Sequence, residues 1–244
     1  MKAHQTRGDS SPGPSHLWRR SSGGRVSLFT EALGTPPSVR GEGITNRGSR
    51  VFRRWEPSRS KLAAALVLGY PGRIPESGER WLYLGAAQGG TASYIADLLG
   101  PAGRLYALER SVRAFARLIR VAEQYPNLLP ILADARNPGS YVSLVPPVDG
   151  LYVDVAQPDQ LEIAETNARW MLRDRGALLM ALKTSSMGRD TGPSGHRSRA
   201  LERLRRRWEV DQPLNLAPHH RGHFWLSARP RRALFSETGG ARVS

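Results

Sequence analysis

The stretch RWLYLGAAQGGTASYIAD, from Arg80 to Asp97, decides the fold that this sequence predicts. Its apolar run from Trp81 to Leu84 has the length of a buried strand and is too short for a helix. Gly85 follows, then a loop with the pair Gly89-Gly90, and from Thr91 onward the pattern is that of an amphipathic helix. A strand, a glycine turn and a helix N-terminus in this order let the backbone approach a ligand closely. The GxxxGG pattern alone is weak, because it departs from GxGxxG and also suits a plain tight turn.

The next predicted strand adds a second indication of a nucleotide site. RLYALE, from Arg104 to Glu109, reads as a buried strand that ends in a carboxylate. Glu109 lies 20 residues after Gly89, the spacing at which an acidic side chain reaches the ribose hydroxyls in dinucleotide-binding folds. The sequence therefore predicts an adenosine-type cofactor between this turn and this strand.

Strands and helices continue to alternate along the chain. The patterns predict a helix at Val112 to Tyr125, a strand at Leu128 to Asp134, a strand at Asp149 to Val155, a helix at residues 159–172 and a strand at Ala177 to Lys183. Such alternation is typical of an α/β fold, with a parallel sheet covered by helices on both faces. Ligands of these sheets bind beyond the carboxyl ends of the strands. The residues at or just past these ends are Gly85, Glu109, Asp134, Asp154 and Lys183.

The composition narrows the functional classes. The 244 residues include no cysteine, which excludes disulfides and thiolate metal sites. The chain has no run of about 18 apolar residues and no N-terminal apolar signal region, so we expect a cytoplasmic protein with no membrane partner. A net charge of +15 attracts polyanions, of which nucleic acid is the commonest. The very basic segment from His196 to Trp208 is interpreted either as a solvated helix face or as a phosphate-contacting one.

The composition also divides the chain into three parts. Residues 1–50 are basic and rich in Ser, Gly, Pro and Arg, with one apolar patch from Val26 to Leu33. We expect them to be poorly ordered, because they cannot bury enough surface to fold alone. Residues 51–230 carry the strand and helix patterns and form the predicted cofactor-binding domain. Residues 231–244 are expected to be a flexible C-terminal tail.

Two lysines stand out in a chain that uses arginine at most basic positions. Of the 36 basic residues only three are lysines, and two of these, Lys61 and Lys183, lie within the predicted domain. A lysine can lose its proton whereas an arginine keeps it, so an amine is required at these positions unless the lysines survive by chance. Lys61 also lies in the first turns of a predicted helix, KLAAALVL, where a cation is unfavourable for the helix dipole.

Three histidines, His219, His220 and His223, lie within five residues, between two predicted closing strands at 210–216 and 223–230. Such a cluster raises a metal site as an alternative. No acidic or cysteine partners lie nearby in the sequence, so we expect no metal.

Five segments, in this order and at these separations, match one family: RSKLAAALVLG, WLYLGAAQGGTAS, LADAR, DGLYVDVAQP and MALKTSS. They closely resemble the archaeal fibrillarins, which are RNA-guided 2′-O-methyltransferases of box C/D ribonucleoproteins. The resemblance extends from about Trp55 to Ala228. It implies that residues 51–230 form a class I S-adenosylmethionine (SAM)-dependent methyltransferase domain, Rossmann-like, with a mostly parallel seven-stranded sheet and one antiparallel strand. Residues 1–50 look unlike the β-rich N-terminal lobe of that family, and Arg110 and Gly222 replace a phenylalanine and an aspartate that are usual there.

The resemblance also implies the residues that hold SAM. These are Gly85, Ala86, Ala87, Gly89 and Thr91 along the methionine and ribose, Glu109 at the ribose hydroxyls, Asp134 and Ala135 at the adenine, and Asp154 and Gln157 near the sulfonium. The group around the target ribose comprises Lys61, Asp154, Lys183 and His223. The implied partners are a guide RNA, target rRNA or tRNA, a box C/D scaffold protein and, through it, a kink-turn-binding protein of ribosomal type.

The chemistry explains these residue types. Methyl transfer is an in-line displacement, so the positioning of nucleophile and donor supplies much of the acceleration. A ribose hydroxyl is a weak nucleophile, and an amine close to another cation loses its proton more readily and can act as its base. We therefore assign Lys183 as the candidate base, Lys61 as the residue that positions the ribose or phosphate, Asp154 as the group that orients Lys183 and the hydroxyl, and His223 as a contributor.

Other functions stay open at this stage. A stand-alone SAM-dependent enzyme acting on another RNA position or on a protein glutamine fits the same fold, and methylation without a guide RNA would favour it. A non-catalytic RNA-binding member also fits the fold, although the retention of both lysines, Asp154 and His223 argues against it. A nicotinamide-dependent dehydrogenase is a more distant alternative, which a titration with SAM against NAD distinguishes.

Overall fold

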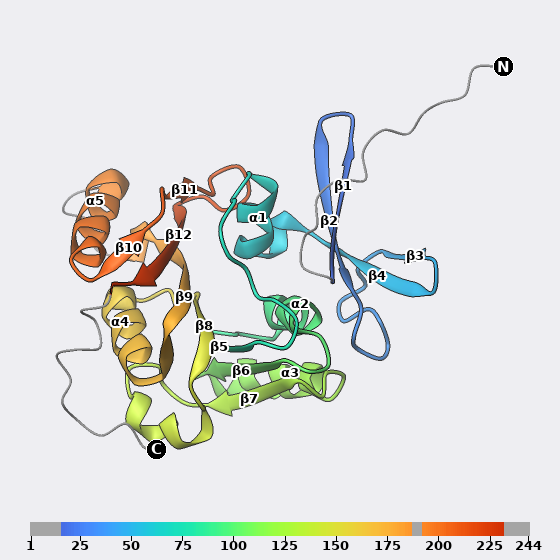
Figure 1. Ribbon diagram of the computed structural model, residues 1–244, viewed down its shortest axis with the longest axis horizontal. Coiled ribbons are helices and arrows are strands. Elements are labelled where there is room, and N and C mark those ends of the chain that lie inside the picture. The colour runs from blue at the N-terminus through green and yellow to red at the C-terminus, as the bar shows by residue number, and fades with distance from the viewer. Residues whose placement is uncertain (1–15, 187–191, 232–244) are drawn as a thin grey trace.

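The computed structural model describes residues 16–186 and 192–231 and distributes their strands over two sheets (Figure 1). The small sheet is antiparallel. In spatial order its strands are β1 (Leu17–Ser22), β2 (Arg25–Glu31), β4 (Arg50–Trp55) and β3 (Ile44–Arg47). Gly23 and Gly24, both at positive φ, form the tight turn that joins β1 to β2.

The large sheet carries the fold predicted from the sequence. Its parallel strands are β5 (Arg80–Leu84), β6 (Arg104–Glu109), β7 (Leu128–Leu132), β8 (Val148–Val153) and β9 (Leu172–Lys183). It is completed by β10 (Trp208–Val210), β11 (Leu214–Asn215) and β12 (His223–Pro230). The order is β10-β12-β9-β8-β5-β6-β7, and β12 runs antiparallel to both of its neighbours. The mostly parallel sheet with one antiparallel strand is therefore confirmed, with the short β11 added beside β12.

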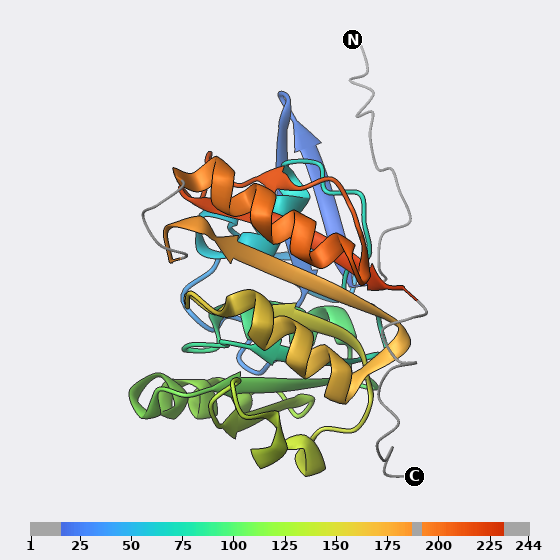
Figure 2. The same ribbon diagram turned by 90° about the vertical axis from the view of Figure 1, so that its left-hand side faces the viewer.

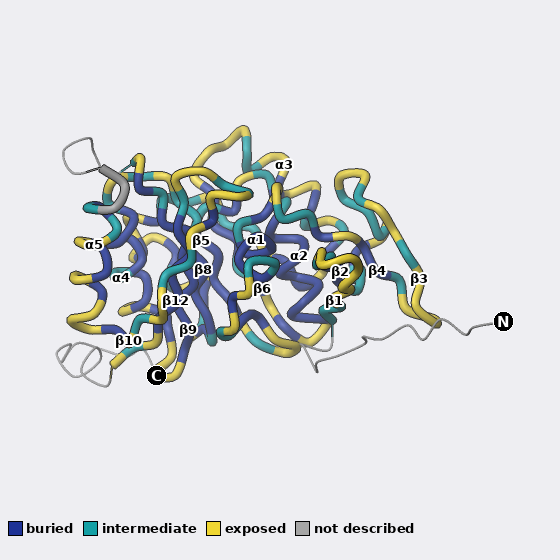
Figure 3. The backbone as a smooth tube through the Cα atoms, turned by 90° about the horizontal axis from the view of Figure 1, so that it is seen from above, coloured by how far each residue is buried: buried dark blue, intermediate teal, exposed yellow. Residues whose placement is uncertain are grey.

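Helices cover both faces of this sheet. They are α1 (Lys61–Val67), α2 (Gly90–Leu99), α3 (Val112–Ala122), α4 (Gln160–Met171) and α5 (Gly192–Arg205). Alternate residues of β5 enter two separate cores, since Trp81 and Tyr83 pack with α1 and α2 whereas Leu82 and Leu84 pack with α4 and α5. Figure 2 shows α4 and α5 lying across the same face. The strands between the two cores are buried along most of their length (Figure 3).

Short 3₁₀ turns connect several of these elements. They are η1 (Pro57–Arg59), η2 (Pro138–Ser140), η3 (Val142–Leu144) and η4 (Thr184–Ser186). Two of them flank the residues of interest: η1 precedes α1 and Lys61, and η4 follows β9 and Lys183. Ser60 caps α1, because its hydroxyl accepts the backbone N–H of Ala63.

The expectation that residues 1–50 are poorly ordered is wrong for the part that the structure describes. Residues 17–55 form the small sheet, and its Leu28 and Trp55 join the core around α1 and α2. The sheet is stabilised by surface that lies far along the chain, which the local composition does not reveal. Residues 1–15 and the predicted tail from 232 onward lie outside the described residues.

Within residues 16–186 and 192–231, none of the helices is both long enough and apolar enough to cross a membrane.

Candidate active site

A pocket of about 180 Å³ opens at the carboxyl ends of β5, β6, β7 and β8. Its wall comprises Gly85, Ala87, Leu108, Glu109, Arg110, Ala133, Asp134, Ala135, Asp154, Val155, Ala156 and Gln157. Most of the predicted cofactor residues are among them. Ala86, Gly89 and Thr91 are not, because Ala86 is buried beneath the turn and the other two lie at the start of α2. Leu108, Arg110, Ala133, Val155 and Ala156 line the pocket without having been predicted as site residues, although each adjoins one that was.

The glycine turn brings β5 and β8 close together at the pocket floor. Gly85 has φ +84°, and a Cβ on it would meet the carbonyl oxygen of Asp154 at 2.8 Å. Only glycine fits this approach. Ala87 has φ +49°, and it is the sole non-glycine residue at positive φ within 16–186 and 192–231. Backbone strain of this kind is concentrated at functional sites.

Glu109 is held at the end of β6 by two backbone donors. The N–H of Ala87 donates to Oε2 at 2.9 Å and the N–H of Ser111 donates to Oε1 at 2.7 Å. The residue is 9% exposed. A carboxylate offers about four acceptor positions, so these two bonds orient Glu109 and leave lone pairs for a ligand.

The outer rim of the pocket carries Asp134 between two arginines. Arg110 lies 3.6 Å and Arg136 lies 3.8 Å from its Oδ2. Arg136 makes its shorter contacts with Asp159. Two nitrogens of the Arg136 guanidinium donate to the Asp159 carboxylate at 2.6 and 3.1 Å. All of these groups are partly exposed, so salt screens the pairs.

Lys61 and Asp154 form an ion pair at the other end of the pocket. The ammonium lies 2.8 Å from both carboxylate oxygens. Burial raises the pKa of Asp154 above its ordinary value, and the Lys61 charge opposes that rise. The pair accounts for a cation in the first turn of α1, because the carboxylate compensates the unfavourable helix dipole.

Lys183 ends β9, and its backbone is fixed by a buried amide. Gln160, at the start of α4, accepts from the Lys183 N–H and donates to its carbonyl, both at 3.0 Å. The side chain differs from that of Lys61: within the described chain, no carboxylate is paired with the Lys183 ammonium. Gln160 was not predicted, because nothing in its local pattern distinguishes it from other helix-start residues.

The histidine loop, residues 216–223, joins the two lysine segments. His223 pairs with Lys183 across β12 and β9. The imidazole of His220 bonds through Nε2 to the carbonyl of Pro57, just before α1, at 2.8 Å. On the other side of the loop, the carbonyl of Gly222 accepts from Thr184, which follows Lys183.

Burial and the charge of Lys61 lower the pKa of both His220 and His223 below the ordinary value of an imidazole. Their rings lie 6.1 Å apart, edge to face. No group of three or more His, Cys, Asp or Glu side chains suited to a metal ion was found in the described ranges.

These features define the class of protein. The mostly parallel sheet with one antiparallel strand, and the glycine turn facing an acidic strand end, are the architecture of class I SAM-dependent methyltransferases. The fibrillarin family model matches residues 16–232. The fibrillarin-like rRNA/tRNA 2′-O-methyltransferase of Aeropyrum pernix is 41% identical over 210 residues, which are 86% of this chain and 90% of that protein. The chain belongs to the fibrillarin family, as the sequence motifs predict.

Two solved structures extend this comparison. Aeropyrum pernix fibrillarin in complex with natively bound S-adenosyl-L-methionine has a TM-score of 0.81 and 39% identity, covering 89% of this chain and 96% of that one. A chain of a fibrillarin/Nop5p complex has a TM-score of 0.75 and 32% identity, covering 84% and 94%. The family match begins at residue 16, so the small sheet belongs to the family region, which the motifs placed only from Trp55 onward.

Proposed function

We propose that this chain transfers the methyl group of SAM to ribose 2′-hydroxyls of rRNA, of tRNA or of both, within a box C/D ribonucleoprotein. The observation that carries the proposal is the arrangement at one sheet edge. A pocket with an oriented Glu109 adjoins the Lys61–Asp154 pair, and Lys183 and His223 are neighbours across β9 and β12. The membership in the fibrillarin family supports the same reaction.

The pocket residues fit SAM. Glu109 has free lone pairs for a ribose diol, and the missing Cβ of Gly85 lets the backbone of Asp154 lie close to the turn at the pocket wall. Asp134 and Ala135 would hold the adenine, while Asp154 and Gln157 would face the positive sulfonium. Ala86, Gly89 and Thr91 would act indirectly, by shaping the turn and the start of α2. When bound, SAM supplies an electrophilic methyl carbon activated by its sulfonium.

The two lysines of the site would have different roles at the target ribose. Lys61 is held by Asp154, so its ammonium group would occupy a fixed position beside the ribose or phosphate. Lys183 has no such partner among the described residues and is the candidate base for the 2′-hydroxyl. His223 lies opposite Lys183 and would help to orient that hydroxyl.

The proposal includes the partners that the resemblance implies. A guide RNA would select the target nucleotide, a scaffold protein would hold the enzyme to the guide, and a kink-turn-binding protein would join through the scaffold. A family relative has been solved in complex with Nop5p, which supports a scaffold partner for this chain. The cytoplasmic location expected from the sequence remains part of the proposal.

Reconstitution tests this function. Purified chain, SAM labelled in its methyl group and target RNA are combined with and without a box C/D guide RNA and scaffold protein. We expect ribose methylation only in the complete mixture. Methylation of RNA or protein without guide and scaffold would instead support the stand-alone enzyme. SAM binding without any methylation in the complete mixture would contradict catalysis and leave a non-catalytic RNA-binding protein.

A further inference from the structure

The two faces of the small sheet have different surroundings. Its inner face packs against the large domain, where Leu28 and Trp55 join the core around α1 and α2, and Arg53 is fully buried. Cross-strand register defines the opposite, outer face, since directly paired residues point to the same side. Trp18 pairs with Phe29 and Phe29 with Arg54. We name this side the arginine–aromatic face, and its large side chains are Trp18, Arg20, Arg25, Phe29, Glu31, Arg47, Arg50, Phe52 and Arg54.

Three aromatic rings form the centre of this face. Trp18 stacks on Phe29 with ring centroids 4.6 Å apart and meets the edge of Phe52 at 5.7 Å. Phe29 and Phe52 are only 6% and 3% exposed, yet they belong to neither of the two hydrophobic cores. The aromatic cluster is therefore separate from the packing that holds the sheet to the large domain.

Arginines lie over each of these rings. The guanidinium carbons of Arg20, Arg47 and Arg50 are 5.7, 5.4 and 5.2 Å from the rings of Phe29, Trp18 and Phe52 respectively. A guanidinium stacked on an aromatic ring keeps its positive charge. Nucleobases stack on both aromatic rings and arginine planes.

The charge of the face is strongly one-sided. Its five arginines are Arg20, Arg25, Arg47, Arg50 and Arg54. Glu31 is the only carboxylate on the strands of this face, and it is already bonded to His16 and Arg50. Arg54 is paired with Glu56, which lies just past the end of β4. Such a surface complements a polyanion that also carries planar groups, which describes single-stranded nucleic acid.

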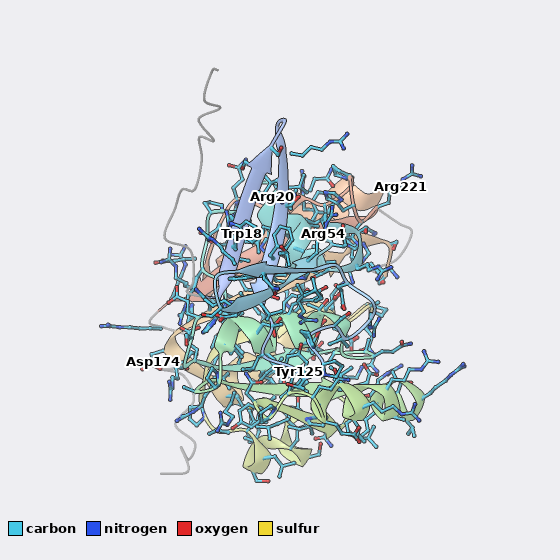
Figure 4. The ribbon with its side chains drawn as sticks, turned by 90° about the vertical axis from the view of Figure 1, so that its right-hand side faces the viewer. Trp18, Arg20, Arg54, Tyr125, Asp174 and Arg221 are labelled. Atoms are coloured by element: carbon cyan, nitrogen blue, oxygen red, sulfur yellow. The ribbon has the colours of Figure 1, made fainter. Side chains whose placement is uncertain are left out.

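We propose that the arginine–aromatic face binds single-stranded RNA. The inference extends the proposed function, because it places RNA on a surface outside the pocket. The two are connected through the chain, since β4 continues directly through η1 into α1 and Lys61. Figure 4 looks onto this side of the molecule and labels Trp18, Arg20 and Arg54 on the small sheet. RNA that crosses this face can remain attached while the target ribose occupies the site.

The experiment measures the affinity of the full chain for a fluorescein-labelled single-stranded RNA of mixed sequence, by anisotropy over a range of KCl concentrations and without SAM. The test variant is Arg20→Gln/Arg25→Gln, which removes two exposed charges from the face. The matched control is Arg80→Gln/Arg169→Gln, two exposed arginines at the amino end of β5 and the carboxyl end of α4. The logarithm of the binding constant falls as the logarithm of the salt concentration rises, and each phosphate that the protein no longer neutralises should make this slope less steep by about 0.7. We expect the slope of the test variant to be less steep than that of the wild type by roughly 1.4, and the slope of the control to be unchanged.

A third variant separates stacking from charge. Trp18→Leu removes the ring and keeps the arginines, so it should weaken binding several-fold with an unchanged salt slope. Ultraviolet crosslinking of wild-type chain to the same RNA should map to peptides from residues 17–55. Crosslinking uses the wild-type chain, so it locates the bound RNA even if Trp18→Leu fails to fold.

Equal losses in the test and control variants, with crosslinks elsewhere, would overturn the proposal. The proposal would also be overturned if Arg20→Gln/Arg25→Gln bound RNA normally and lost binding to a scaffold protein, because the arginine–aromatic face would then be a protein-docking surface. A chain that binds RNA on this face and shows no methylation with guide and scaffold would contradict the proposed function alone.

Discussion

At the scale of single residues, the two lysines of the site differ in what their ammonium groups contact. Lys61 lies 2.8 Å from Asp154, whereas Lys183 has no carboxylate partner in the described part of the chain. A nearby carboxylate favours the charged form of an amine. The roles proposed here, Lys183 as the base and Lys61 as the fixed charge, therefore predict different effects for substitutions at the two positions.

Substitution of Lys183 by arginine tests this division. Lys183→Arg keeps the positive charge and removes the group that can lose its proton, so methylation should fall about 10²- to 10⁴-fold. SAM affinity, measured by calorimetry, should change little. Lys61→Arg is the matched control, because an arginine there can still pair with Asp154, and it should retain much more activity. Near-normal turnover of Lys183→Arg would show that its amine is not the base.

The pH dependence of SAM binding tests the Lys61–Asp154 pair. Burial raises the pKa of Asp154 and the Lys61 charge lowers it, so removing that charge leaves the pKa still higher. A carboxylate that faces the sulfonium must be ionised, so SAM binding should weaken on acidification at a higher pH in Lys61→Met than in wild type. Calorimetric titration across pH 4–8 measures this. The control is Arg59→Gln, which removes an exposed cation at η1 and should leave the pH dependence of SAM affinity unchanged.

The same shift has a consequence for stability. Because the folded-state pKa of Asp154 is raised, its contribution favours folding below the unfolded pKa and is lost as pH rises through the folded pKa. The ionised form of Asp154 therefore stabilises the fold less than its protonated form does.

At the scale of elements, the turn after β5 depends on one glycine. Gly85→Ala combines strain at φ +84° with a contact of 2.8 Å to the Asp154 carbonyl. Gly78 is a matched control, because it also has φ +84° and a Cβ on it would meet no other atom within 4 Å. Gly78→Ala should reduce the free energy of unfolding by about 1–2 kcal/mol.

We expect Gly85→Ala to lower stability further and to reduce SAM affinity at least tenfold, because it pushes Asp154 out of place. Thermal denaturation and calorimetry of the two variants measure the difference. Equal behaviour of the two alanine variants would show that the close approach to β8 has no role in binding.

At the scale of the whole molecule, one buried ion pair joins the small sheet to the SAM-binding unit. Arg53 of β4 and Asp97 of α2 are both fully buried and lie 2.7 Å apart. Asp97 also accepts from Thr30 and from the backbone N–H of Leu33. The helix α2 begins at the glycine loop, so this contact fixes the small sheet relative to the pocket.

Loss of Asp97 should be strongly destabilising. Asp97→Ala leaves Arg53 buried without its main partner, and we expect the free energy of unfolding to fall by about 3–5 kcal/mol. Asp149→Ala breaks a partly exposed pair with Arg173 and should cost about 1 kcal/mol or less. Urea denaturation measures both. Replacing both buried partners, as Arg53→Met/Asp97→Leu, should recover most of the loss, and a loss for Asp97→Ala no larger than for Asp149→Ala would contradict the assigned role.

Much of the large domain was predictable because its signals are local. The run from Trp81 to Leu84, the carboxylate of Glu109 and the apolar strand before Asp154 each follow from side-chain periodicity, which needs no knowledge of distant residues. Parallel strands then place their carboxyl ends at one edge, which is why these residues meet at a single pocket. The small sheet was missed because its stability depends on burial against α2, which is remote in sequence.

By itself, the sequence determined the alternating strands and helices, the edge at which the site lies and the residue types present there, since backbone periodicity and strand ends are local properties. Only the tertiary structure decided which of these side chains are partners. Lys61 meets Asp154 across 93 residues, and His220 meets Pro57 across 163. These contacts depend on how the sheet, its helices and the closing loop pack together, and packing between distant segments leaves no local pattern to read.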